Sequence, residues 1–173
     1  MFGEAADFTG AFAFELRRRE IQLIDLELRR ADSDADRAIV LYRPDGEYAL
    51  SADIESAPGG IFARALDVES LRVTAEGEGS PQTGAARYAG AIGGQDWFSG
   101  AARWTPTNWN AEAGARLDLL PLTAGLVERF GDTLSANASG ERIGAFTLHA
   151  ETPHLAADIT GALDEDRALD GSA

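Results

Sequence analysis

TLSANASGERIGAFTLHAETPHLAADITGAL, residues 133–163, carries a small or apolar side chain at every second position. The alternation breaks at Gly140, resumes at Phe146 and resumes once more after Pro153. A period of two is typical of a β-strand with one buried face and one solvated face. The stretch therefore predicts three consecutive strands whose apolar face consists largely of alanine and leucine.

The clearest turn in the chain lies between two runs of β-favouring residues, 39–42 and 48–54. Pro44 presets the φ angle of a turn, and Gly46 can adopt the left-handed conformation that completes it. The two runs therefore predict an antiparallel hairpin.

Elsewhere the alternation changes phase, and each change predicts a turn or a bulge. One change lies near Arg19, where a helix over residues 16–30 is the alternative because good helix formers fill that segment. Another lies at Ser70, within a strand predicted over residues 66–79. Residues 87–110 are rich in glycine and tryptophan and predict short strands. Their aromatic side chains fit a core, a stacking platform or an interfacial belt, with a core favoured: Trp97, Phe98, Trp104 and Trp109.

Residues 121–131 interrupt the strands and predict one short helix. After Pro121 the apolar side chains fall on one helical face, and Gly131 ends the helix. Roughly nine or ten strands around this helix predict a mostly β protein, with a sheet, a sandwich and a barrel as the alternatives. Residues 1–173 are expected to form a single β-rich segment, with a frayed acidic tail at 164–173.

Composition opposes several classes of function. The formal net charge of -14 disfavours nonspecific binding to nucleic acid, because that binding depends on cations that neutralise phosphates. The sequence contains no cysteine, which removes thiolate metal sites, disulfides and cysteine nucleophiles. The first residues, MFGEAADFTG, do not resemble an export signal, so any such signal is expected outside this chain. The longest uncharged apolar run, 119–127, is far shorter than the roughly 20 residues that cross a bilayer.

Candidate chemistry is sparse. His149, Glu151 and His154 are residue types that bind zinc, but Pro153 is expected to turn the chain before a third ligand converges. DSDADR, residues 32–37, begins like a calcium loop but lacks its glycine and its final glutamate, so an acidic surface loop is predicted. Nucleophile-elbow, dinucleotide-binding and phosphate-loop motifs are all missing. The sequence therefore predicts a protein that is not an enzyme and binds no metal or other cofactor.

The segment LDLLPLTAGLVERFGDTLSANASGERIGAFTLHAETPHLAADITGAL, together with LDVESLRVTAEGEG upstream, resembles the strand units of the AsmA-like superfamily. The resemblance is to bacterial intermembrane bridge proteins of the YdbH and TamB type. It lies in the LLPL helix opening, in the LSANASGE strand that ends in glycine and an acid, and in the amphipathic strands that follow.

The resemblance implies a long, curved antiparallel sheet, a taco-shaped β-groove, whose concave apolar side carries phospholipid acyl chains between the inner and outer membranes. It also implies a periplasmic location, tethering to the inner membrane, and contact with both membranes through parts of a longer protein that this chain lacks. The chain would then be a fragment of a repeat protein.

The function predicted from this resemblance is lipid binding and transfer without catalysis. A segment of an outer-membrane β-barrel and an extracytoplasmic structural β-sandwich are the alternatives. The sequence leaves open whether the apolar face is an open groove or a closed core against the 122–130 helix or a second sheet. The positions predicted to face lipid belong to the last strands: Leu134, Ala136, Ala138, Phe146, Leu148, Ala150, Leu155, Ala157 and Ile159.

Overall fold

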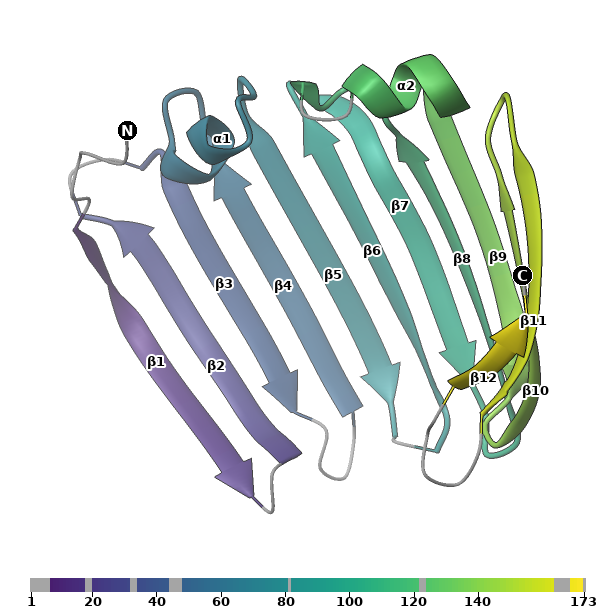
Figure 1. Ribbon diagram of the computed structural model, residues 1–173. Helices are drawn as coiled ribbons and strands as arrows, with labels where there is room; N and C mark the ends of the chain where they lie inside the picture. The colour runs from purple at the N-terminus through teal and green to yellow at the C-terminus, as the bar shows by residue number, and fades with distance from the viewer. Residues whose placement is uncertain are drawn as a thin grey trace.

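A computed structural model describes residues 7–17, 20–31, 34–43, 48–80, 82–121, 124–163 and 169–172. These residues form one open antiparallel sheet of twelve strands, in which every strand pairs with its neighbours in sequence (Figure 1). The mostly β, single-sheet prediction is confirmed. The strands are β1 (Phe8–Arg17), β2 (Glu20–Arg30), β3 (Asp36–Arg43), β4 (Tyr48–Ser56), β5 (Leu71–Gly79), β6 (Gly84–Ile92), β7 (Gln95–Trp104), β8 (Asn108–Arg116), β9 (Thr133–Glu141), β10 (Gly144–Glu151), β11 (Ala156–Leu163) and β12 (Leu169–Ser172).

The described part of the chain contains more strands than the nine or ten predicted. Residues 16–30, for which a helix was the alternative, belong to β1 and β2, with a register shift between Glu15 and Leu16. The predicted hairpin over residues 39–54 is confirmed by the pairing of β3 with β4, although its turn at 44–47 lies outside the described residues. Strands β6 to β8 have 9 or 10 residues each, so the prediction of short strands there was wrong.

The C-terminal segment also differs from the prediction. Residues 169–172 form β12 and pair with β11, from Thr160 opposite Ser172 to Leu163 opposite Leu169. The tail is therefore not frayed there, because the edge of β11 offers it backbone hydrogen-bond partners. Residues 164–168 and 173 lie outside the described residues.

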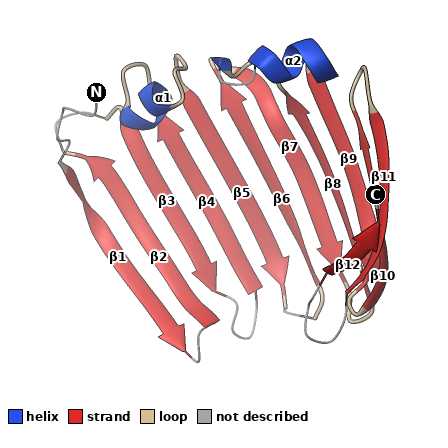
Figure 2. Cartoon of the chain, in the orientation of Figure 1, coloured by secondary structure: helices blue, strands red, loops and turns tan. Residues whose placement is uncertain are grey.

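Two short helices, α1 (Ile61–Ala65) and α2 (Ala124–Phe130), lie at the same end of the strands (Figure 2). Helix α2 confirms the helix predicted within 121–131, and Gly131 ends it with a φ of 95° and an N–H bonded to the Val127 carbonyl. Helix α1 was not predicted. The strand expected from residue 66 begins only at Leu71, because α1 and a following turn occupy residues 61–70.

Strand register gathers most apolar side chains on one side of the sheet, which we call the apolar face. Leu26 of β2 lies opposite Val40, which lies opposite Ala52, and the same row continues through Ala75 and Tyr88. Side chains that are opposite each other in an antiparallel pair point to the same side. The alternating patterns of the separate strands therefore combine into one continuous surface.

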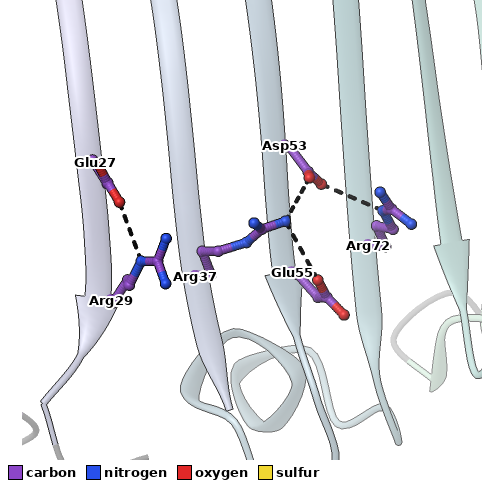
Figure 3. A network of polar contacts seen from close by, with 6 residues as sticks. All are labelled: Glu27, Arg29, Arg37, Asp53, Glu55 and Arg72. Atoms are coloured by element: carbon purple, nitrogen blue, oxygen red, sulfur yellow. Dashed lines mark hydrogen bonds and ion pairs between the residues drawn. The ribbon is translucent and has the colours of Figure 1, made fainter. Parts of the chain in front are cut away.

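The other side of the sheet, which we call the polar face, carries most of the charged strand residues. Arg37 of β3 donates to Asp53 of β4 at 2.7 Å, and Glu55 lies 3.7 Å from the same nitrogen (Figure 3). Arg72 of β5 reaches Asp53 at 3.3 Å. These cross-strand charge pairs favour the register in which most apolar residues share the opposite face.

The sheet is curved. In Figure 1 the first strands are seen broadly face-on, whereas β10 and β11 are seen nearly edge-on. Ala136, Ala138 and Ala150 on the apolar face are half-buried although their neighbours are small, while Ala145 and Ala162 on the polar face are exposed. We infer from this difference that the sheet curls toward its apolar face at the C-terminal end.

Candidate functional site: the apolar face

Eight of the nine positions predicted to face lipid lie together on the apolar face. Leu148 of β10 is opposite both Ala138 of β9 and Ile159 of β11. Ala150 is likewise opposite Ala136 and Ala157, in the next row along the strands. The ninth position, Leu155, lies in the turn before β11 and is 52% exposed.

The apolar face is much larger than the predicted site. Sequence reasoning recognised the alternation in the upstream strands but did not assign them to the same surface as the last strands. The signal was present, since each strand repeats the period of two, but turns and a bulge reset its phase. The upstream residues on this face include Phe12, Phe14, Ile24, Leu26, Val40, Leu50, Ile54, Val73, Ala111, Ala113 and Ala115.

Apart from α1, which covers the apolar face at one end of β3 and β4, nothing in the described part of the chain forms a second layer over this face. Among the hydrophobic residues of the described chain, only four are buried: Ala38, Ala63, Leu71 and Ile92. Phe12 and Phe14 are 65% and 49% exposed. The described residues therefore leave the apolar face open, without the closed core that was the alternative.

Helix α2 does not seal the face as one alternative required. It lies beyond the ends of β8 and β9 (Figure 1), and its Leu126 is 46% exposed. Val127 and Phe130 of the same helix are half-buried. No helix among the described residues is long and apolar enough to cross a bilayer.

Three aromatic rings on the apolar face lie over glycines of neighbouring strands. A β-carbon added to any of these glycines would overlap the aromatic residue opposite it. Such pairs shield the bare backbone of a glycine without adding a second layer. The pairs are Trp104 over Gly84, Phe98 over Gly90 and Tyr88 over Gly100.

Two indoles are anchored at the end of the face away from the helices. Trp104 donates its indole N–H to the Ser80 carbonyl at 2.9 Å, and Trp109 donates to the Glu141 carbonyl at 3.1 Å. Both rings are half-buried, and the two residues are opposite each other in β7 and β8. They are therefore fixed parts of the apolar surface, which a full core would have buried completely.

At β3 and β4, a buried polar cluster around Asp36 holds α1 against the helical end of the face. This carboxylate is 1% exposed and accepts hydrogen bonds from Ser56 Oγ at 2.5 Å and from the Ile61 N–H at 2.8 Å. Ser56 Oγ in turn accepts from the Ala63 N–H at 3.0 Å. Asp36 therefore supplies the capping acceptor that α1 lacks in its own sequence, since the N-cap residue Gly60 has no side chain that could accept a hydrogen bond.

The acidic surface loop predicted for residues 32–37 is wrong at Asp36. The residue opens β3 and points toward α1, and Arg30 Nη1 lies 3.9 Å from its Oδ2. Residues 32 and 33 lie outside the described residues. No local signal distinguishes Asp36 from Asp34, because its partners lie 20 and 25 residues further along the chain.

The candidate metal ligands lie on the polar face or beyond it. His149 Nδ1 is 2.7 Å from Asp158 Oδ1, and His149 Nε2 is 4.0 Å from Glu151 Oε2. The hydrogen bond to Asp158 raises the pKa of His149 above its ordinary value. His154 lies in the turn after Pro153, and no group of three or more such residues in the described chain could hold a metal ion.

Comparison with known proteins adds no assignment. No protein-family model matches this chain, and no curated protein or solved structure shows significant similarity to it.

Proposed function

We propose that the apolar face binds the acyl chains of phospholipids and that the chain is a non-enzymatic segment of a lipid-transfer protein. The observation that carries this proposal is a continuous apolar surface across the sheet, which among the described residues only α1 covers, at one end. Exposed apolar surfaces of this extent are typical of sites that bind another apolar body.

The chemistry of the face favours hydrocarbon over a single extended protein segment. The rows of Ala111, Ala113, Ala136 and Ala150 offer neither donors nor acceptors. A single extended protein segment lying there would leave its own backbone groups without partners, because unpaired N–H and C=O groups are costly to desolvate. An acyl chain has no hydrogen-bonding groups, so its contact with this surface leaves no donor or acceptor unpaired.

The mechanism would be hydrophobic shielding without fixed polar clamps. Each methylene removed from water contributes about 0.8 kcal/mol, whichever part of the face shields it. A chain can then move between equivalent positions without breaking a specific bond. The acidic net charge of -14 repels anionic membrane surfaces, so delivery to membranes would depend on other parts of a longer, periplasmic protein tethered to the inner membrane.

The test is phospholipid binding by the purified chain. Native mass spectrometry is expected to detect bound phospholipid, and vesicles of phosphatidylethanolamine and phosphatidylglycerol are expected to exchange a fluorescent phospholipid through the protein. Ala136→Asp should weaken binding by about tenfold or more, because a carboxylate beside hydrocarbon loses its hydration. Ser135→Asp is the matched control, since Ser135 is the adjacent residue on the polar face.

A folded wild-type chain that neither carries nor exchanges phospholipid would refute the proposal. Equal loss of binding in the two variants would also refute it, because the effect would then follow charge and not the face that carries the charge. A second sheet bound over the face, detected as a stable homodimer or complex, would instead support the structural β-sandwich alternative.

A further inference from the structure

The polar face carries an open hollow of about 380 Å³ over the middle strands, β6 to β9. Ala101 of β7 and Gly114 of β8 form its floor, and its lining includes Arg87, Glu112 and Asn137. Arg87, Ala101, Glu112 and Asn137 are neighbours in one cross-strand row, so their side chains point to the same side of the sheet. The hollow has the size of the smaller ligand sites in proteins, which occupy about 300–1,000 Å³.

The floor of the hollow is flat because its residues are small. A β-carbon built at Gly114 would have its nearest neighbour 3.9 Å away, so the backbone of β8 is open there. Ala101 is half-buried, whereas Ala145 on the same face is exposed. The longer side chains of Arg87 and Glu112 start two strand spacings apart, about 10 Å, on either side of Ala101. The floor therefore lies between two charged side chains of opposite sign.

The polar side chains of the hollow have no partners of their own in the described part of the chain. Arg87 lies directly opposite Glu76 of β5 and in the same row as Glu112, yet its guanidinium forms no ion pair with either. The Glu112 carboxylate and the Asn137 amide form no hydrogen bond to any described residue. Charged side chains of β3, β4 and β5 on the same face do pair with one another (Figure 3). The hollow therefore keeps its donors and acceptors available to a ligand.

The residue types around the hollow favour a neutral ligand that is rich in hydroxyl groups. Arg87 can only donate hydrogen bonds, Glu112 can only accept them, and Asn137 does both. A hydroxyl group both donates and accepts, so neighbouring hydroxyls of one ligand can satisfy all three side chains. Glu112 disfavours an anion in the hollow and Arg87 disfavours a cation, because each would meet a like charge.

We propose that this hollow is a binding site for a neutral oligosaccharide. Arg87, Glu112 and Asn137 bind hydroxyl groups of the saccharide, and Ala101 and Gly114 contact the C–H face of a sugar ring. The site lies on the opposite side of the sheet from the apolar face, so it does not depend on the proposed lipid binding. The two faces can be occupied at the same time, because the sheet itself separates them.

The first test is a titration of the purified chain with maltotriose, cellotriose and triacetylchitotriose, followed by amide NMR. At least one of the three is expected to bind, with the largest shifts at the backbone amides of Ala101, Glu112 and Gly114. Glu112→Gln should weaken that binding about tenfold or more, as expected for loss of a hydrogen bond to a charged group. Glu141→Gln is the matched control and should bind as the wild type does, because Glu141 lies on the same face about 13 Å along β9 from Asn137.

The second test fills the hollow without changing any charge. Ala101→Leu places a larger side chain on the floor and should weaken binding about tenfold or more. Ala145→Leu adds the same side chain to an exposed part of the same face and should leave binding unchanged. Circular dichroism melts verify that each variant is folded, and Ala101→Val replaces Ala101→Leu if the latter is not.

A folded wild-type chain that binds none of the three saccharides would overturn the proposal. Shifts confined to the apolar face would overturn it as well, and so would equal loss of binding in the Glu112 and Glu141 variants, because the saccharide would then bind outside the hollow. Phospholipid binding is measured separately on the other face, so failure of the saccharide site leaves the lipid proposal standing.

Discussion

The two ends of the sheet build the same apolar face from different side chains. In β1 to β5 the face carries large residues such as Phe12, Leu26 and Ile54, and α1 is anchored over one end of it by Asp36. In β8 to β11 alanine is the commonest residue of the face, and no helix is held against it by a comparable buried cluster within the described residues. Size of side chain and degree of cover therefore change together along the sheet.

The difference shows two ways of keeping a one-layer sheet stable. Large side chains shield one another where they stand side by side, and a buried hydrogen-bonded cluster adds a specific tertiary anchor. Small side chains shield one another little, so curvature and the continuous backbone ladder must reduce the exposure of the C-terminal strands. The N-terminal end is therefore expected to be sensitive to loss of polar contacts, and the C-terminal end to loss of space.

The largest expected effect is at the N-terminal anchor. Asp36→Ala removes the acceptor for Ser56 Oγ and for the Ile61 N–H, and is expected to lower the free energy of unfolding by about 3 kcal/mol. Urea denaturation followed by circular dichroism measures this change, and hydrogen exchange at the Ile61 and Ala63 amides should accelerate. The control, Asp34→Ala, alters an exposed aspartate in the preceding turn and should change stability by no more than about 0.5 kcal/mol. Equal denaturation midpoints for the two variants would show that the cluster does not anchor this end.

A smaller effect is expected where space is limited at the C-terminal end. A β-carbon at Gly140 would lie 2.8 Å from the Ala145 carbonyl oxygen and against Phe146, so Gly140→Ala should lower stability by about 1 to 2 kcal/mol. Gly114 in the adjacent strand has its nearest neighbour 3.9 Å away, and Gly114→Ala should be neutral or stabilising by about 0.5 kcal/mol. Thermal melts of both variants distinguish these outcomes. A destabilising Gly114→Ala would mean that strand glycines here are required for backbone flexibility and not for space.

The smallest effect concerns the polar face of the C-terminal strands. The pKa of His149 should exceed the 6.5 of an unperturbed histidine, because Asp158 stabilises its protonated form. Any stabilisation linked to this raised pKa is complete below pH 6.5 and is lost as the pH rises through the folded-state value. An NMR titration of His149 should show its pKa falling toward 6.5 in Asp158→Asn. An unchanged titration would show that Asp158 is not the cause.

Much of the fold could be predicted because its strands are local features joined by hairpins. The alternation around Ile24, the antiparallel pairing of β3 with β4, and the helix ended by Gly131 are all set by residues close in sequence. Helix α1 could not be predicted in this way. Its five residues lack a capping side chain, and the groups that bind its N-terminus come from β3 and β4.

The candidate site was predicted in part for the same reason. The face of Leu134 and Leu148 follows from a period of two, whereas the position of Leu155 depends on a turn. The aromatic rings over strand glycines could not be foreseen, because Tyr88 and Gly100 meet only through the register of β6 with β7, which shifts between Gly90 and Ala91.

The sequence by itself determined where most strands run and which of their side chains share a side, because a two-residue period is a property of each strand alone. Only the tertiary structure decided that these sides join into one surface, that Asp36 is buried beneath α1, and that the described chain leaves this surface open. Those features depend on pairing register and curvature, which arise from contacts between strands and not from the pattern within any one of them.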